Sequence, residues 1–310
     1  MNRVVIIGIP SSAGARQVGQ DKAPQSFRNA GLLNSLRSAG FDVHDSGDLT
    51  HVLFKPDVEN PRQQNLALVC DTIQRVSERV ASVSADHAKL IALGGDCTVT
   101  LGVVGGLMAH APNLGLIYFD GDLDLNTPDT TVSGIFDGMV MSHLIGNGAE
   151  PLAQIGPRYP LIAEQNIVLF GYNVDAGSID LIETERLAEL SMAKYPAPKI
   201  RENVENAAIA ALTQLESQVD DLLIHFDVDV IDYRDFPAAD VPHPNGLSFD
   251  EAMVALRIFA SSSKFAGLVI TEFNSDRDKD GSLARRLIGA LVRIFGDAQK
   301  CWGDTLVMHQ

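Results

Sequence analysis

The length, composition and charge of the chain exclude several classes of protein. Its 310 residues, 45% of them hydrophobic, can bury a full core, and no linker-like stretch divides them. A formal net charge of −16 does not suit binding to nucleic acid or to an anionic membrane, because both need clustered lysine and arginine. Residues 1–310 are therefore expected to form a single α/β domain.

The cysteines and the apolar runs indicate a cytoplasmic protein. Cys70, Cys97 and Cys301 are too few and too scattered for a disulfide framework, which fits a reducing compartment. A strand at residues 4–9 leaves no room for a signal peptide before it, and no apolar run approaches transmembrane length. We therefore expect no contact with a membrane.

Strand and helix patterns alternate from the start of the chain. A Gly/Ser-rich loop at 10–20 follows the first strand, and Ala23-Pro24 opens a helix that is expected to run through residue 39. A short strand near 41–43 and a loop at 45–61 come next. A helix at about 64–84 then carries apolar residues at a spacing that makes one buried stripe.

The same alternation continues to the other end of the chain. Strands are expected at 90–93, 114–119, 167–170, 221–226 and 266–270. Helices are expected at about 98–109, 179–190, 204–219, 249–260 and 282–295, and a further helix, ending at 144, is expected after residues 135–139. Helices that regularly separate short apolar strands are typical of an α/β fold with a parallel sheet.

Acidic or thiol groups follow four of these strands. The groups are Cys97 after strand 90–93, Asp120, Asp122 and Asp124 after 114–119, Asp227 and Asp229 after 221–226, and Glu272 after 266–270. Ligands in open α/β sheets bind beyond the carboxyl ends of the strands, so these groups are expected to meet in one crevice. Crowded carboxylates need a cation, and we expect a divalent metal there, present as a pair of ions. Taken alone, the acidic run at 120–124 also fits a solvated turn.

Several blocks together resemble the signatures of the arginase/agmatinase ureohydrolase family in order and spacing. They are Gly94-Gly95-Asp96-Cys97, residues 120–128, 131–138 and 227–232, and Glu272-Phe273-Asn274, and the resemblance spans nearly the whole chain. It implies a three-layer α/β/α sandwich with a central, mainly parallel sheet, commonly assembled into homotrimers or homohexamers. It also implies hydrolysis of a guanidinium or amidine carbon by hydroxide bridging two Mn²⁺ ions.

The resemblance assigns roles to individual residues. One metal would be held by Cys97, Asp120, Asp124 and Asp227, and the other by Asp120, Asp122, Asp227 and Asp229. Glu272 would bind the cationic substrate, Asn126 and Ser133 its α-carboxylate, and Asp175 its α-amino group. These positions favour a small guanidino substrate such as arginine or Nω-hydroxyarginine over agmatine. The expected catalytic residues are Asp124, Asp137 and Glu272.

Three positions depart from the family pattern, because Cys97, Asp122 and Asp137 stand where members usually have histidine. Five aspartates and one thiolate would place six negative charges against the four positive charges of two divalent ions. The surplus leaves a bound water less acidic, so catalysis is expected to be weaker and to rise at alkaline pH. Mn²⁺ is the expected metal, and a Cys97 thiolate keeps Zn²⁺, Fe²⁺ and Co²⁺ open. A buried neutral thiol is the alternative for Cys97.

Two functions remain open. The first is an amidinohydrolase that releases urea or a substituted urea, and retention of the aspartates and Glu272 favours it. The second is a weak or inactive arginase-fold protein that serves as a ligand-binding or oligomeric regulatory subunit, which the loss of histidines favours. Asp137 is either an acid with a raised pKa, a ligand for a second cationic group of the substrate, or an inert loop residue.

The remaining histidines receive simpler interpretations. His225 lies two residues before Asp227 on the same strand face, so it is a candidate partner behind the metal ligands. For His143 and His243 a structural role is expected.

Overall fold

One parallel sheet forms the centre of the computed structural model, which describes residues 2–85 and 88–302. Within these residues, eight strands pair in the order β2-β1-β3-β8-β7-β4-β5-β6, and every pairing between neighbours is parallel. The strands are β1 Arg3–Gly8, β2 Asp42–Asp48, β3 Lys89–Leu93, β4 Leu114–Phe119, β5 Ile167–Phe170, β6 Ala193–Tyr195, β7 Asp221–Asp227 and β8 Phe265–Thr271.

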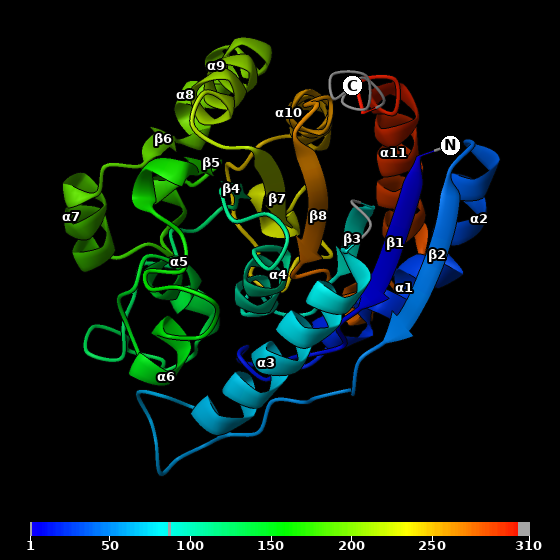
Figure 1. The fold of residues 1–310 in the computed structure, drawn as a ribbon. Coiled ribbons are helices and arrows are strands. Elements are labelled where there is room, and N and C mark those ends of the chain that lie inside the picture. Colours follow the sequence, from blue (N-terminus) through cyan, green and yellow to red (C-terminus); the bar gives the residue numbers. More distant parts are fainter. Residues whose placement is uncertain (1, 86–87, 303–310) are drawn as a thin grey trace.

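Helices cover both faces of this sheet (Figure 1). One layer contains α1 Ala23–Asn29, α2 Leu32–Ser38, α8 Ala197–Glu202, α9 Val204–Glu216, α10 Phe249–Ala260 and α11 Ser282–Ala298. The other contains α3 Leu66–Val83, α4 Val99–Leu107, α5 Val140–Leu144 and α6 Glu150–Ala153, with α7 Leu181–Glu189 at its edge. The three-layer α/β/α sandwich expected from the sequence is confirmed.

Alternation along the strands builds a separate core on each face. In β1, Val4 and Ile6 pack toward α1, α2 and α11, whereas Val5 and Ile7 pack toward α3 and α4. Because both faces are buried, the central strands are almost continuously apolar, as in Leu114–Phe119. Most of the acidic side chains therefore come after the apolar runs, at the carboxyl ends of these strands.

Some expected elements differ from the observed ones. The helix expected at 23–39 is two helices, because Gly31 adopts φ 90° between them and breaks the right-handed path. Strand β2 extends to Asp48, well beyond the expected residue 43. Strand β6 escaped sequence reasoning because its three residues are only partly buried at the sheet edge. The expected single domain over 1–310 includes residues outside the described ones, so its boundaries stay a prediction.

Helices α3 and α4 pack closely because α4 carries glycines at the contact. A methyl group at Gly102 would lie 2.6 Å from the carbonyl oxygen of Ile73, and one at Gly106 would lie 2.5 Å from that of Ser77. This packing holds α4 in place, and α4 begins at Val99, two residues after Cys97. No helix among the described residues is both long and apolar enough to cross a bilayer.

We predict that Gly102→Ala lowers the free energy of unfolding by about 1–3 kcal/mol, because the added methyl overpacks this contact. Gly296→Ala in α11 is the matched control, since its methyl would meet nothing within 4 Å. The control should be neutral or stabilising by up to about 1 kcal/mol, from helix propensity alone. Urea denaturation measures both. Equal effects of the two substitutions would contradict the close packing of α3 on α4.

Candidate active site

The four strands whose ends carry acid or thiol groups are neighbours in the middle of the sheet. In the order β3-β8-β7-β4, their carboxyl ends lead to Cys97, Glu272, Asp227 and Asp120. Because the strands are parallel, all four ends lie at the same edge of the sheet. The sequence prediction that these groups converge is thus met by the sheet order.

A cavity of about 440 Å³ opens at this edge. Its lining contains most of the predicted site residues, namely Asp120, Asp122, Asp124, Asn126, Ser133, Asp137, Asp227, Asp229 and Glu272. Cys97 is buried beside them, next to Asp227. Asp175 is exposed and lies outside this lining, so the structure does not bring it together with the others.

Two short acidic sequences adopt the same local turn. In Asp120-Gly121-Asp122 the carboxylate of Asp120 accepts a bond of 2.7 Å from the backbone N–H of Asp122. In Asp227-Val228-Asp229 the carboxylate of Asp227 accepts one of 2.8 Å from Asp229. Aspartate favours this turn because its short side chain reaches the backbone two residues on. The turn sets two carboxylates close together at each strand end.

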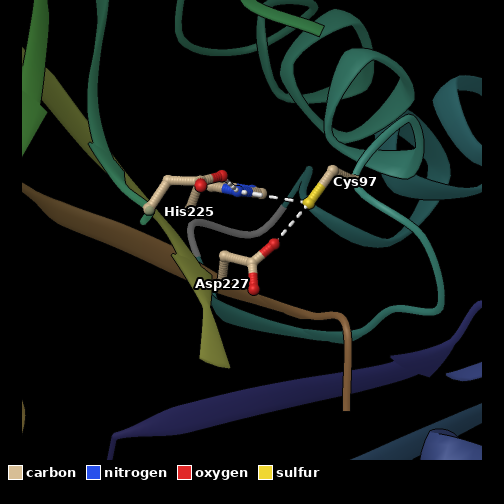
Figure 2. Close-up of side chains that lie close together, drawn as sticks. Cys97, His225 and Asp227 are labelled. Carbon is tan, nitrogen blue, oxygen red and sulfur yellow. Dashed lines mark hydrogen bonds and ion pairs between the residues drawn. The ribbon is translucent and has the colours of Figure 1, made fainter. Parts of the chain in front are cut away.

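The first group of potential metal ligands consists of Cys97, Asp120, His225 and Asp227. The Cys97 thiol donates to Asp227 Oδ2 over 2.8 Å, and its Sγ lies 3.7 Å from His225 Nε2 (Figure 2). The same Nε2 atom lies 3.3 Å from Asp120 Oδ2. The four side chains thus turn their ligand atoms toward one point.

Burial and mutual repulsion perturb the ionisation of this group. Burial, and then the nearby carboxylates, raise the pKa of Asp120, of Asp227 and of the Cys97 thiol. Burial alone lowers the pKa of His225 to about 3, so its ring is neutral at physiological pH. All four buried groups therefore disfavour their charged forms. A bound cation would offset the cost of burying the negative charges of the acids and the thiolate.

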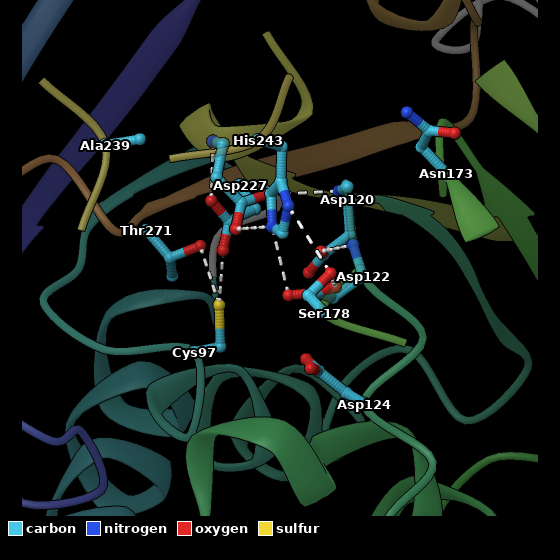
Figure 3. Close-up of polar contacts among 12 residues, drawn as sticks. Cys97, Asp120, Asp122, Asp124, Asn173, Ser178, Asp227, Ala239, His243 and Thr271 are labelled. Carbon is cyan, nitrogen blue, oxygen red and sulfur yellow. Dashed lines mark hydrogen bonds and ion pairs between the residues drawn. The ribbon is translucent and has the colours of Figure 1, made fainter. Parts of the chain in front are cut away.

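The second group consists of Asp122, Asp229 and His243. His243 Nε2 lies 3.1 Å from Asp122 Oδ2 and 3.2 Å from Asp229 Oδ2, and the ring reaches them from the loop that follows β7 (Figure 3). Although burial lowers the pKa of His243, the carboxylates of Asp229 and Asp122 raise it to about 11. This histidine, for which a structural role was expected, therefore lies inside the site.

Asp124 stands apart from both groups. Its backbone adopts the left-handed region at φ 51°, which aspartate enters more readily than most residues other than glycine, and Oδ2 accepts a hydrogen bond from the Tyr118 hydroxyl. Burial, followed by the charges of Asp120 and Asp137, raises its pKa. The side chain still lines the shared cavity. The Tyr118 hydroxyl bonds only Oδ2, so Oδ1 is the oxygen that this bond does not use.

Glu272 provides a buried carboxyl group without a partner. Neither of its side-chain oxygens has a hydrogen-bond partner among the described residues, although only 2% of the residue is exposed. Its backbone adopts φ 61° and is fixed by bonds of 2.9 Å from its N–H to Gly95 and from the Asp240 N–H to its carbonyl. Strain of this kind persists where the surroundings impose it, commonly at functional sites. Burial and Asp137 raise the pKa of Glu272.

Asp137 lies close to Cys97 and Glu272. It accepts a hydrogen bond of 2.7 Å from the backbone N–H of Cys97, and the three residues form a third group of potential ligands. Burial first, and then the charge of Asp96, raise the pKa of Asp137. The interpretation of Asp137 as an inert loop residue is therefore the weakest of the three.

Sequence reasoning missed several contributors. These contributors belong to no recurrent motif. They are Tyr118, Ser178, and the histidines His225 and His243, whose rings contact the acids directly. Alternation of side chains along the strand predicts that His225 and Asp227 share one face. It does not predict the contact of His225 with Asp120. His143 does have the expected structural role, since its nitrogens bond the backbone of Met139 and Ala149.

Comparison with known proteins identifies the family. Residues 2–295 match the sequence model of the arginase family. The chain is 28% identical over 293 residues to an arginase of Brevibacillus brevis, covering 94% of this chain and 97% of the relative. The structure matches the arginase of Bacillus caldovelox with a TM-score of 0.88 and that of Bacillus cereus with 0.86. Each is 26% identical and covers 96% of this chain and 99% of the other. The chain therefore belongs to the arginase family of hydrolases.

Proposed function

We propose that this chain is a metal-dependent amidinohydrolase that cleaves a guanidino C–N bond of an arginine-like amino acid, such as arginine or Nω-hydroxyarginine. The products would be urea, or a substituted urea, and the corresponding amine. The observation that carries the proposal is the unpartnered buried carboxyl of Glu272 in a cavity lined by acids. A guanidinium group and two divalent ions supply the positive charge that this cavity lacks.

The donor set fits two divalent ions. We assign one ion to Cys97, Asp120, Asp124 and Asp227, and the other to Asp120, Asp122, Asp227 and Asp229. The grouping of Cys97 with Asp120 and Asp227, and of Asp122 with Asp229, supports this assignment. Asp124 joins through the oxygen that the Tyr118 hydroxyl leaves free. When bound, such a pair of ions lowers the pKa of a water molecule so that it can act as a nucleophile.

The substrate contacts follow from the lining of the cavity. Glu272 would orient the guanidinium, while Asn126 and Ser133 would meet an α-carboxylate, and all three line the same space. For Asp175 we propose a contact with the α-amino group of the substrate. This contact requires that the substrate extend to the rim of the cavity, because Asp175 lies outside the cavity lining. Its exposed position makes Asp175 the weakest of these contacts.

Asp137 is proposed as the acid that protonates the leaving amine. Asp137 lies in one group with Cys97 and Glu272, which supports a role close to the proposed metal and the proposed guanidinium. The direction of its pKa shift supports the role, since a carboxyl that retains its proton can donate it.

Further features are proposed from the family resemblance. The ion is expected to be Mn²⁺, because oxygen donors dominate, with Zn²⁺, Fe²⁺ or Co²⁺ as alternatives through Cys97. The chain is proposed to act as one cytoplasmic domain assembled into homotrimers or homohexamers.

Purified protein should contain about two divalent metal ions per chain, as in other two-metal hydrolytic sites. Urea release should be found with one member of a panel of arginine, Nω-hydroxyarginine, agmatine and guanidino acids. Elemental analysis and a colorimetric urea assay measure the two quantities. Metal at full occupancy without turnover on the whole panel would contradict the proposed enzyme and favour a binding protein.

Cys97→His should increase the Mn²⁺-dependent kcat/KM by at least about tenfold, because imidazole suits Mn²⁺ better than a thiolate does. Cys301→His is the matched control, since Cys301 is exposed. It should leave the kinetics unchanged. If Cys97→His behaves like the control, Cys97 is not a ligand.

The stability gained from metal should grow with pH. Because the pKa values of Asp120, Asp124 and Asp227 are raised, the folded metal-free protein retains protons that the unfolded chain has lost. Their contribution to stability is full below the unfolded pKa of about 4 and is lost as pH rises through the folded values. Metal displaces these protons and removes the penalty.

Thermal unfolding with and without Mn²⁺ across roughly pH 5 to 8 tests this linkage. The difference in Tm between the two forms should widen as pH rises. A difference that stays constant over this range would show that the perturbed carboxyls are not where the metal binds.

A further inference from the structure

The first and the second group of potential ligands each contain one histidine from outside the recurrent acidic motifs. His225 lies in the first group and His243 in the second. The resemblance expected histidine at the positions of Cys97 and Asp122 instead. We propose that His225 and His243 are metal ligands, one in each half of the centre, and that they supply the imidazoles missing at those two positions. This inference rests on the proposed two-metal function.

The ring of His225 is fixed so that one nitrogen faces the acids. Nδ1 lies 2.7 Å from Thr100 Oγ1, and the ring stacks on Tyr118 with centroids 4.1 Å apart and an interplanar angle of 8°. When Nδ1–H is donated to Thr100, Nε2 turns its lone pair toward Asp120 and Cys97. A ligating histidine typically has its second nitrogen held by a polar group in this way.

His243 repeats the arrangement in the second half. Its Nδ1 lies 3.4 Å from Ser178 Oγ, and Nε2 faces Asp122 and Asp229 (Figure 3). Only 2% of the residue is exposed. Both histidines thus have a hydroxyl behind the ring and two acidic or thiol groups in front of it.

The loop that carries His243 is fixed by contacts on both sides. The backbone N–H of Tyr233 donates to the carbonyl of His243 over 3.0 Å. The side-chain amide of Asn173 donates to the carbonyls of Pro244 and Asn245, each over 3.1 Å. A ligand held by a rigid backbone is preorganised, which favours metal affinity.

A comparison within the chain separates ligation from ordinary burial. His143 is also buried, yet its Nδ1 lies 2.6 Å from the Met139 carbonyl and its Nε2 accepts a bond of 3.0 Å from Ala149. Both of its nitrogens are therefore used by the backbone. The Nε2 atoms of His225 and His243 instead face carboxylates, and in the case of His225 also a thiol, that could bind the same metal ion.

Three variants test the inference. His225→Phe retains an aromatic ring against Tyr118 while removing the nitrogens, His243→Ala removes the second imidazole, and His143→Gln is the control. Wild-type protein and the control should bind about two ions per chain. Each test variant should retain about one, with the dissociation constant of the other ion raised by more than about 100-fold. Elemental analysis after dialysis and competition with a chelator measure these values.

Proton NMR of the Co²⁺-loaded protein distinguishes histidines that bind the metal from histidines that only support the fold. Each ligating imidazole contributes one exchangeable N–H resonance that the paramagnetic ion shifts far from the normal range. Wild-type protein should show one such signal for His225 and one for His243. Each test variant should lose its own signal, and the control should keep both.

The outcomes separate this inference from the proposed function. If wild-type protein binds both ions but shows no shifted imidazole signal, or if the test variants bind metal like the control, the inference is wrong and the proposed function stands. If wild-type protein binds no divalent ion, both are wrong. Variants that merely unfold more easily while keeping both ions would identify the histidines as counter-ions of the acids.

Discussion

The mutual repulsion of buried carboxylates at the ends of the central strands is the constraint on which the site depends. Because β3, β8, β7 and β4 are neighbours, their ends place Asp120, Asp227 and Glu272 around one small cavity. Burial raises the pKa of each of these three groups. Protonation relieves the repulsion in the metal-free protein, whereas cations would relieve it without protons, so ionisation, stability and metal binding are linked.

The same constraint explains how the site differs from its family pattern. Cys97 and Asp122 stand where the resemblance expects histidine, which on its own would leave the centre too negative. His225 and His243 approach the same two places from other parts of the chain and add donors without negative charge. The fold thus retains two imidazoles at the centre while their positions in the sequence have changed.

Sequence reasoning predicted the part of the site that depends on local pattern. Apolar strands followed by spaced aspartates indicated the sheet and the meeting of Asp120 with Asp227, because both follow from strand period and parallel topology. It did not predict the position of His243, because that depends on how the loop after β7 folds over the strand ends. Asp175 was assigned from resemblance alone; it is exposed and outside the cavity lining, although Ser178 of the same loop is part of that lining. The break at Gly31 depends on a backbone angle that periodicity does not encode.

Two metal ions are proposed to lie side by side among these acids. An anomalous difference map from crystals grown with Mn²⁺ tests this proposal most directly. Two peaks are expected beyond the ends of β4 and β7, both in contact with Asp120 and Asp227. A cavity without anomalous density, with Asp120 and Asp227 in the positions they have without metal, would contradict it.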